Sequence, residues 1–390
     1  MINKLVILGS TGSIGTTTLN SIRNKTNYKV VLLSANKNIK KLYKQSLKHN
    51  VRNVIIEDKK IYSKYKYHFK QKKINLHLGF NSIEKILKKK VHYSVNSISC
   101  IDGLEPTLKI IPFSKKILIA NKESIICGWN IINKKLKKHK THFIPIDSEH
   151  FSIWSLIKKE SHKNIDKIIL TASGGPFLKK QKKDLLNIKP KFALKHPNWK
   201  MGKKISIDSS TMMNKIFEFI EAKKIFNLDK NKLSIIIHPL SYIHAIVFFK
   251  SNIVKLLAHE TNMTIPIKNA LGIFDKSSDK EIFSQIDKLN FLKFEKPKVK
   301  QFPLLSILDL IPNESSFFET ILITINDNLV KKYLSNIINY ISIHRNLLRF
   351  IKSPFFIKFY KLKPKNIYDI NNMIKITNNY IDNKIKYYEK

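Results

Sequence analysis

The sequence predicts an α/β fold that opens with a Rossmann-like domain built on a parallel sheet. A glycine-rich turn follows the first apolar run of the chain. Short β-branched runs then alternate with helical patterns up to about residue 150, which is typical of βαβ units. A length of 390 residues allows two or three domains, and a hydrophobic content of 43% indicates a folded protein.

The first domain is expected to span residues 1–150 and to bind a dinucleotide. Its strands are predicted from apolar runs separated by turn residues and helical stretches. These runs are Lys4–Leu8, Tyr28–Ser34, Asn53–Ile56, Tyr93–Ile98, Lys116–Ala120 and His142–Ile146.

A central α+β domain is expected over residues 151–275. Successive strands there leave less room for crossover helices, so a mostly antiparallel sheet is predicted. Residues 276–303 are polar, with Pro297 near the end, and are expected to form a linker. Residues 304–390 are predicted to form a helical C-terminal domain. The expected central strands are Ile165–Leu170, Leu233–His238, Ile243–Phe249 and Ile253–Leu257.

The net charge of +44 raises the question of a polyanionic partner. Almost all of this charge is lysine, whereas proteins that read nucleic acids rely on arginine for bidentate contacts. Abundant Lys, Asn and Ile with scarce Gly and Arg is what an A+T-rich coding sequence would produce. We therefore expect no nucleic-acid partner, and the charge could instead steer a phosphorylated substrate inward.

Cysteine content and hydropathy bear on the compartment. Cys100 and Cys127 are too few for a disulfide framework or a structural zinc site. No stretch approaches the roughly 18 uninterrupted apolar residues of a membrane span. Leu5–Leu8 already has a strand pattern, which leaves no room for a leader peptide. A cytoplasmic protein without a membrane partner is expected.

Gly9, Gly12 and Gly15 lie between the first expected strand and the following helix. Their positions allow a tight turn and a close approach of the backbone to a pyrophosphate at the helix N-terminus. The spacing differs from the familiar Gly-x-Gly-x-x-Gly, and an ordinary strand–helix turn is the simpler alternative. The location at the start of an α/β pattern favours nucleotide binding.

The end of the second expected strand indicates which dinucleotide would bind. An NAD site normally has an acidic residue there for the ribose hydroxyls. This chain has Asn36-Lys37-Asn38, without an acid and with one cation that could attract a 2′-phosphate. A solvated loop lysine is the alternative, but the strand position favours NADP.

Three acidic side chains are candidates for a metal site. Asp147 and Glu149 follow an expected strand, where an acid more commonly caps a helix. Asn214, Glu218 and Glu221 lie at positions i, i+4 and i+7 of an expected helix, where a solvated polar stripe is the more common outcome. Asp147, Glu149 and Glu218 together would suit Mg²⁺ or Mn²⁺.

Hydroxyl, amide and ammonium groups suited to a phosphate occur close to these acids in the sequence. They are Ser173 beside two glycines, Ser209, Asn214 and Lys215. Trp199 lies in an apparent loop and could be a core anchor or part of a lid over the substrate. His238 and His244 are expected to be structural histidines.

These motifs resemble the 1-deoxy-D-xylulose 5-phosphate reductoisomerase family. They occur in the family's order over the larger, N-terminal part of the chain. The matching stretches are Gly9–Gly15, Ala120–Ser124, Asp147–His150, Ser173–Phe177, His196–Trp199, Asp208–Lys215, Glu218–Ala222 and His238–His244.

The resemblance implies a homodimer with an NADPH domain, a catalytic domain and a helical C-terminal domain. It implies rearrangement of 1-deoxy-D-xylulose 5-phosphate and its reduction to 2-C-methyl-D-erythritol 4-phosphate, in isoprenoid precursor synthesis without mevalonate. Asp147, Glu149 and Glu218 would hold the metal, and Lys122 would act with them in catalysis. The implied substrate contacts are Lys122, Ser148, Glu149, Ser173, His196, Ser209, Asn214, Lys215 and Glu218. The implied NADPH contacts are Thr11, Gly12, Ser13, Ile14, Asn36, Lys37, Asn38, Asn121, Glu123 and Gly202.

Two positions depart from the family pattern: Asn36 and Ala172 stand where the family commonly has glycine. Beyond Leu304 the resemblance fades, apart from short matches such as Asn326-Asp327. Three alternatives stay open from the sequence. They are another two-domain NADP oxidoreductase, a basic nucleic-acid-binding protein on a Rossmann-like scaffold, and a homologue without catalytic activity.

Overall fold

The computed structural model describes residues 2–186, 188–199, 201–276 and 279–388, which form two compact units. The first unit contains residues 1–125, 129–154 and 263–275. The second contains residues 126–128, 155–262 and 276–390. The chain therefore passes into the second unit three times, at residues 126, 155 and 276, and returns to the first unit twice, at residues 129 and 263.

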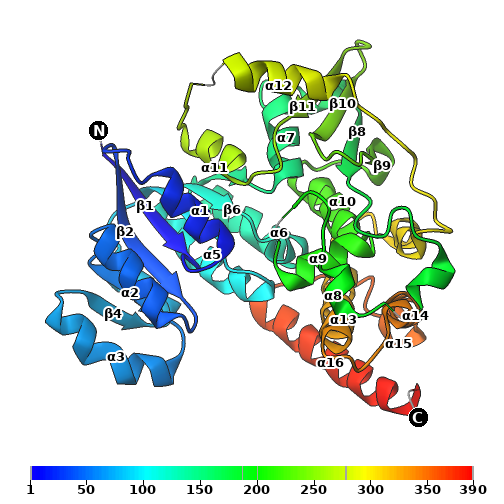
Figure 1. Ribbon diagram of the computed structural model, residues 1–390. Coiled ribbons are helices and arrows are strands. Elements are labelled where there is room, and N and C mark those ends of the chain that lie inside the picture. The colour runs from blue at the N-terminus through cyan, green and yellow to red at the C-terminus, as the bar shows by residue number, and fades with distance from the viewer. Residues whose placement is uncertain (1, 187, 200, 277–278, 389–390) are drawn as a thin grey trace. The chain divides into compact units, whose positions relative to one another are not determined.

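The first unit is built on a seven-stranded sheet in which every neighbouring pair is parallel (Figure 1). The strand order is β4-β3-β2-β1-β5-β6-β7. This is the Rossmann-like arrangement that the sequence predicts. The strands are β1 Asn3–Leu8, β2 Tyr28–Ala35, β3 Asn53–Ile56, β4 Asn75–Leu78, β5 Val91–Asn96, β6 Ser114–Ile119 and β7 His142–Pro145.

Helices pack against this sheet because their apolar residues recur with helical spacing. Helices α2 and α3 contact strands β2, β3 and β4 (Figure 1). Asn38 caps α2 and Asp58 caps α3, each by accepting a hydrogen bond from a backbone N–H in the first turn. The helices are α1 Ser13–Ser21, α2 Ile39–Lys48, α3 Lys59–Gln71, α4 Ile83–Ile86, α5 Leu104–Ile110, α6 Lys122–Lys138 and α7 Ser148–Ile157, of which α6 and α7 each also contribute a few residues to the second unit.

Helix α11, Thr264–Leu271, also belongs to the first unit, whereas the sequence analysis placed it in a central domain of residues 151–275. Its buried residues Ile267, Ala270 and Leu271 join the core around β1 and β2, and the helix contacts α1. The Tyr28 hydroxyl donates a hydrogen bond to the Leu271 carbonyl over 2.5 Å. Burial of this apolar face explains why the segment folds with the sheet of the first unit.

The second unit contains a four-stranded sheet of order β11-β10-β8-β9. The strands are β8 Ile165–Ala172, β9 Leu233–Ile237, β10 Ile243–Phe249 and β11 Val254–Ala258. Strand β10 is antiparallel to both of its neighbours, whereas β8 and β9 are parallel. The sheet is thus mostly antiparallel, as expected, and the residues between β8 and β9 form the crossover that a parallel pair requires.

Helices make up the rest of the second unit, including its C-terminal region (Figure 1). Helix α13, Phe318–Leu334, has 12 of its 17 residues buried. It contacts α9 (Lys203–Ser210), α14 (Tyr340–Ile351) and α16 (Ile367–Tyr388). The helices are α8 Pro190–Ala193, α9 Lys203–Ser210, α10 Met213–Ile225, α12 Asp279–Leu289, α13 Phe318–Leu334, α14 Tyr340–Ile351, α15 Pro354–Ile357 and α16 Ile367–Tyr388.

Two described elements differ from the expected ones. Strand β4 was not expected, because its four residues include polar Asn75 and His77. Helix α12 lies within the segment expected to be a linker, where Ile282, Phe283 and Ile286 recur at helical spacing. Within the described ranges, no helix is both long and apolar enough to span a bilayer.

Candidate active site

The glycine-rich loop after β1 has the backbone that a dinucleotide site needs. Gly9 has a φ of +77°, which only glycine adopts without strain. A Cβ on Gly15 would lie 2.5 Å from the Ser10 Cα, so the start of α1 packs directly on the loop. The Ser34 hydroxyl accepts the Gly9 N–H over 2.9 Å. Ser10 and Gln45 exchange two hydrogen bonds of 2.8 Å. The loop is therefore rigid, and α1 begins at Ser13 directly after it.

The expected cofactor residues of the first unit gather at the ends of two paired strands. Thr11 to Ile14 follow β1, and Asn36 to Asn38 follow β2, its parallel neighbour. Lys37 is exposed there, so its ammonium group is available to a 2′-phosphate. The Asn38 side chain accepts the Lys41 N–H over 3.2 Å, and the Lys41 ammonium group donates to the Thr11 carbonyl over 2.9 Å. The two loops are thus tied together.

Asn121 and Glu123 begin helix α6. The Asn121 side chain caps the helix by accepting the Ser124 N–H over 2.7 Å, and its amide donates to the carbonyls of Ile98 and Cys100. Three local bonds engage this side chain, so a cofactor would meet its backbone rather than its amide. Glu123 is buried in the first turn. Gly202, also expected at the cofactor, belongs to the second unit.

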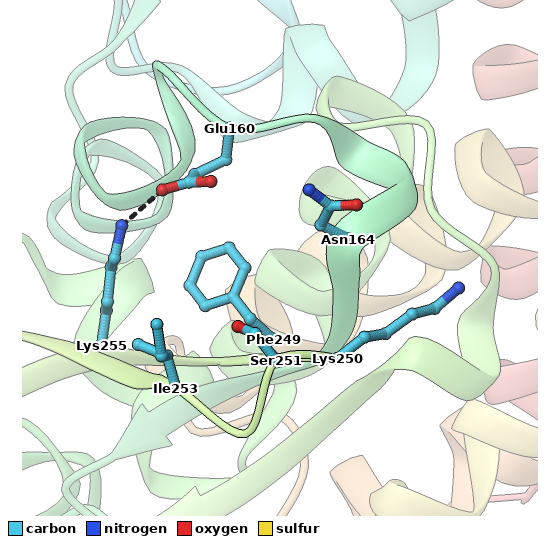
Figure 2. A pocket seen from close by; sticks show the side chains of 7 residues that line it. All are labelled: Glu160, Asn164, Phe249, Lys250, Ser251, Ile253 and Lys255. Atoms are coloured by element: carbon cyan, nitrogen blue, oxygen red, sulfur yellow. Dashed lines mark hydrogen bonds and ion pairs between the residues drawn. The ribbon is translucent and has the colours of Figure 1, made fainter.

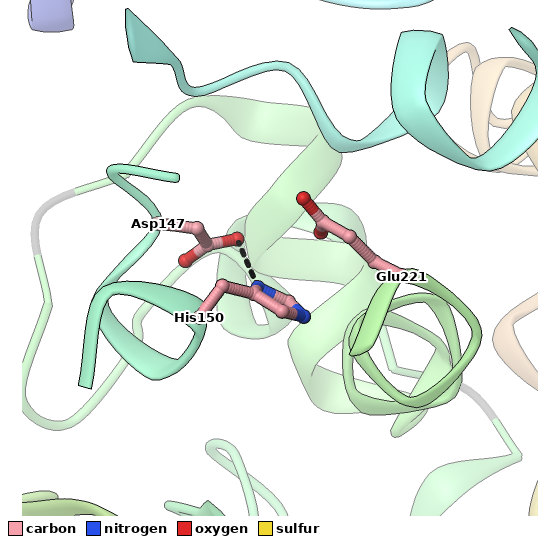
Figure 3. A group of neighbouring side chains, drawn as sticks. All are labelled: Asp147, His150 and Glu221. Atoms are coloured by element: carbon pink, nitrogen blue, oxygen red, sulfur yellow. Dashed lines mark ion pairs between the residues drawn. The ribbon is translucent and has the colours of Figure 1, made fainter. Parts of the chain in front are cut away.

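Two of the three expected metal ligands lie at the start of α7 in the first unit. Asp147 Oδ2 is 2.9 Å from the Lys122 ammonium nitrogen and 4.0 Å from His150 Nδ1 (Figure 3). The Ser148 hydroxyl donates to Glu149 Oε2 over 2.6 Å. Lys122 comes from the start of α6, whose neighbouring strands β6 and β7 end at the same edge of the sheet. The first unit therefore brings together Lys122 and Asp147, two residues to which the family resemblance assigns catalytic roles.

The third expected ligand, Glu218, lies on α10 in the second unit, and only 1% of it is exposed. Its carboxylate accepts the Asn214 amide over 2.5 Å and forms an ion pair with Lys215. Glu221, one turn further along α10 and drawn in Figure 3, is also 1% exposed. The alternative of a solvated polar stripe is therefore wrong for this helix.

The residues expected to bind the substrate phosphate all belong to the second unit. Ser173 follows β8, and its hydroxyl lies 3.0 Å from His196 Nε2 and accepts the Gly175 N–H over 3.1 Å. Ser209 is near the end of α9, and Asn214 and Lys215 are at the start of α10. Met212, between the two helices, has a left-handed φ of +63°, which sets the sharp turn between them.

The loop of the predicted lid is organised around His196. Its Nδ1 accepts the backbone N–H groups of Asn198 and Trp199 over 3.1 and 2.9 Å. Nε2 must then carry the ring proton, so it donates to Ser173. The half-buried Trp199 ring lies edge-on to His244, with ring centres 6.0 Å apart. Asn198 donates to Pro239 and Ser241. Lys200, within the same loop, lies outside the described residues.

Some polar residues next to these sites were missed by sequence reasoning. Asp208 is 2% exposed and bonds to Lys204 and Asn326, which lie on α9 and α13. His150 is fully buried beside Asp147. Asp208 and His150 both lie inside motifs that the sequence analysis names, and this position was the signal that could have marked them. Asn326 lies 118 positions from Asp208, so the sequence alone does not indicate that the two residues pair.

The donor chemistry of both units fits the groups that the sequence implies. The carboxylates of Asp147, Glu149 and Glu218 are hard oxygen donors, the type that Mg²⁺ and Mn²⁺ prefer. The glycine loop offers backbone N–H groups at a helix start, where a Cβ at Gly15 would clash. The three carboxylates are therefore suited to a divalent metal ion, and the glycine loop is suited to the pyrophosphate of a dinucleotide.

A separate cavity of about 350 Å³ occurs in the second unit, near the turn that joins β10 and β11 (Figure 2). An ion pair between Lys255 and Glu160 crosses one side of it, with a nitrogen–oxygen distance of 2.5 Å. No residue expected in the active site lines it. The lining residues are Glu160, Asn164, Phe249, Lys250, Ser251, Ile253 and Lys255.

Comparisons with known proteins agree with the motifs. Residues 5–128 match the family model of 1-deoxy-D-xylulose 5-phosphate reductoisomerase, and residues 143–226 and 259–380 match models of that enzyme's C-terminal domains. The 1-deoxy-D-xylulose 5-phosphate reductoisomerase of Pelagibacter ubique is 50% identical over 98% of both chains. That of Clostridium novyi is 37% identical over 98% of this chain and 99% of its own.

Solved structures of 1-deoxy-D-xylulose 5-phosphate reductoisomerases are also similar to this chain. The reductoisomerase of Zymomonas mobilis in complex with NADPH has a TM-score of 0.87 and 26% identity, and 99% of each chain is covered. Another reductoisomerase, solved with NADPH, fosmidomycin and magnesium, has a TM-score of 0.88 and 28% identity over 100% of both chains. The chain belongs to the 1-deoxy-D-xylulose 5-phosphate reductoisomerase family.

Proposed function

We propose that the chain rearranges 1-deoxy-D-xylulose 5-phosphate and reduces the product with NADPH to 2-C-methyl-D-erythritol 4-phosphate. This reaction serves the synthesis of isoprenoid precursors without mevalonate. The observation that carries the proposal is 50% identity to a reductoisomerase across 98% of the chain. Every polar residue that the family resemblance assigns to metal or phosphate is present.

Asp147, Glu149 and Glu218 are proposed to hold one Mg²⁺ or Mn²⁺ ion. Such an ion would polarise the carbonyl and neighbouring hydroxyl of the substrate as a Lewis acid. Lys122 lies 2.9 Å from Asp147, so its ammonium group can keep that carboxylate oriented and steady negative charge that develops on substrate oxygens. Ser148, whose hydroxyl is bonded to Glu149, is proposed to contact the substrate.

Ser173, Ser209, Asn214 and Lys215 are proposed to bind the substrate phosphate. Hydroxyl and amide groups supply directed hydrogen bonds, and the lysine supplies charge. His196 donates to Ser173, which leaves the Ser173 proton free to point toward a phosphate oxygen. Binding energy from this remote group can orient the reacting carbons, and closure of the Trp199 loop would exclude water.

The glycine loop, the start of α1 and the end of β2 are proposed to bind NADPH, with Lys37 at the 2′-phosphate. This assignment is supported by the rigid loop backbone and the absence of an acid at the end of β2. Asn121, Glu123 and Gly202 complete the proposed contacts. We also propose that the protein is cytoplasmic.

A homodimer is proposed as the working form. Strand β11 is an edge strand of the second unit, and its backbone can pair with another strand. Ile253, Val254 and Leu256 on or beside this strand are 44–54% exposed, and burial of their apolar surface against a second chain would favour association. Sedimentation of the purified protein should give the mass of two chains, and a single-chain mass would contradict the proposal.

Turnover tests the proposed activity directly. Purified protein is mixed with NADPH, Mg²⁺ and 1-deoxy-D-xylulose 5-phosphate, and the loss of NADPH absorbance is followed. The expected result is oxidation that requires all three components, with 2-C-methyl-D-erythritol 4-phosphate as the product. Folded protein that oxidises no NADPH under these conditions would overturn the proposal.

A further inference from the structure

The end of helix α9, which carries Ser209, is held by the C-terminal helices of the same unit. Asp208, directly before Ser209, is 2% exposed. Its Oδ1 accepts the Asn326 amide of α13 over 2.8 Å, and its Oδ2 accepts the Lys204 ammonium over 2.9 Å. Lys204 also lies 3.1 Å from Asp327 Oδ1. Asn326 and Asp327, at the middle of α13, therefore hold α9 through the Asp208 carboxylate and the Lys204 ammonium group.

A second bond acts on the other side of Ser209. The Tyr340 hydroxyl, at the start of α14, donates to the Ser210 carbonyl over 2.8 Å. Burial raises the pKa of the Tyr340 phenol, so the group stays protonated and remains a donor. The ring is held edge-on by Phe177, with ring centres 5.2 Å apart. Ser209 therefore lies between two residues that are each bonded to a different C-terminal helix.

The backbone also leaves Ser209 little freedom to move toward β8. A Cβ on Gly175 would lie 2.8 Å from the Ser209 carbonyl oxygen, so the loop after Ser173 packs directly against this turn. The left-handed Met212 then directs the chain into α10. The proposed phosphate ligands on both loops thus share one tightly packed framework.

Asp208 itself is poorly suited to contact a phosphate. Its carboxylate would repel a dianion, and both of its oxygens already accept bonds from Asn326 and Lys204. Its chemistry is suited to holding a helix end in place. Such placement matters because a phosphate ligand displaced by even a fraction of an ångström loses hydrogen-bond geometry.

We propose that Asn326, acting through Asp208, and Tyr340, acting through Ser210, are positioning residues for the phosphate of the substrate. The inference rests on the proposed function and deepens it. It gives the C-terminal helices a role in substrate affinity, although neither residue is expected to touch the substrate. The effect should therefore fall on the substrate KM and leave the NADPH KM unchanged.

Tyr340→Phe is the mildest test, because it removes one hydroxyl and keeps the buried ring. The substrate KM should rise several-fold, because the variant loses the hydrogen bonds of the Tyr340 hydroxyl to the Ser210 carbonyl and to the Ser210 hydroxyl, which orient the helix end. Tyr333→Phe is the matched control. Its hydroxyl donates to the Ile188 carbonyl over 2.9 Å, and its ring lies edge-on to Tyr340, but it has no bond to α9. The control should leave the substrate KM unchanged.

Asp208→Asn and Asn326→Asp form a stronger test. Each single variant should raise the substrate KM about tenfold, because a bond to a buried charged group is lost. The double variant again places one amide opposite one carboxylate and should recover much of the affinity. Asn328→Asp serves as the control on α13, because the Asn328 amide bonds to Asn378 of α16 over 2.9 Å.

Melting temperature and the NADPH KM are measured for every variant. An unchanged substrate KM in Tyr340→Phe, or a rise in both KM values together, would overturn the inference while leaving the activity of the unmodified protein intact. If the unmodified protein does not turn over the substrate, the proposed function fails instead. A rise in the substrate KM alone, with recovery in the double variant, would support the positioning role.

Discussion

Burial decides how the acidic residues of α10 behave. Glu218 is 1% exposed and is held by an amide and an ammonium group from the preceding turn of the same helix. A buried carboxylate without such partners would be protonated or would destabilise the fold. Asn214 and Lys215 supply such partners to Glu218.

Glu218→Gln should lower turnover by at least about a hundredfold, because a neutral amide is a weaker ligand for a hard divalent cation. NADPH affinity should stay nearly constant, since the proposed dinucleotide contacts lie elsewhere. Turnover and NADPH titration measure the two effects. Glu319→Gln is the control, since Glu319 is also a buried acid, 2.7 Å from Lys224, outside the proposed site. Normal activity in Glu218→Gln would remove this residue from the metal site.

The buried His238 imidazole makes the free energy of unfolding depend on pH. Burial lowers the pKa of this imidazole, and the hydrogen bond to the Lys293 carbonyl offsets the shift only in part. The unfolded chain, with a pKa of about 6.5, then binds the proton more readily than the folded one. The contribution of His238 to the free energy of unfolding is present above that pH and is lost as the pH falls below it.

His238→Asn should flatten this pH dependence, because asparagine can donate a similar hydrogen bond but does not titrate. Denaturant unfolding between about pH 7.5 and pH 5 measures the slope. His162→Asn, at an exposed position, should leave the slope unchanged. Parallel curves for the unmodified protein and His238→Asn would show that His238 does not carry the effect.

Helix α1 depends on its contact with the glycine loop. A Cβ at Gly15 would lie 2.5 Å from the Ser10 Cα and 2.6 Å from the Gly9 carbonyl oxygen, whereas the nearest atom to a Cβ at Gly12 is 3.4 Å away. Gly15→Ala should therefore lower the free energy of unfolding by about 1–3 kcal/mol through overpacking. Gly12→Ala, with an ordinary φ of −74°, should cost less than about 0.5 kcal/mol. Urea denaturation of both variants compares them, and equal losses would contradict the packing argument.

The sequence predicts those strands and helices that can be recognised from the pattern of their own residues. Each of the six strands expected in the first domain forms a strand of the sheet, and its parallel pairing follows from the alternation of strands and helices. Strand β4 is missed because its short sequence, Asn75–Leu78, alternates only weakly. The membership of α11 in the first unit depends on tertiary burial of Ile267 and Leu271, which periodicity alone cannot assign.

In the candidate site, too, features set by neighbouring residues in the sequence are predictable, whereas contacts between distant residues are not. The face of α10 that carries Glu218 and Glu221 follows from helical spacing, but their burial does not. Asn121 appears as a cofactor contact by family resemblance, while the structure also gives its side chain a capping role. The pairing of Asp208 with Asn326 spans 118 positions and could be found only in three dimensions.

For the whole molecule, charge is the dominant surface property. A net charge of +44 means that the folded chain works against its own repulsion. Added salt screens charges that are further apart than the Debye length, which falls from about 10 Å at 0.1 M to about 3 Å at 1 M. Stability is therefore expected to depend on ionic strength.

The melting temperature should rise with sodium chloride and then level off once the repulsion is screened. Thermal unfolding across a series from low to about 0.5 M salt measures this dependence. Levelling distinguishes screening from general salting-out, which keeps rising with concentration. A melting temperature that is constant or falls from the lowest salt upward would mean that the lysines are too widely spaced to destabilise the fold.

The order in which the chain visits its two units affects how it is made. Helix α11 supplies Ile267, Ala270 and Leu271 to the core of the first unit, although this segment follows more than a hundred residues of the second. During synthesis on the ribosome, the N-terminal sheet must wait with part of its apolar surface uncovered until residue 275 has emerged. A nascent chain that stalls before that point would present this surface to chaperones and proteases, so completion of the first unit depends on late translation.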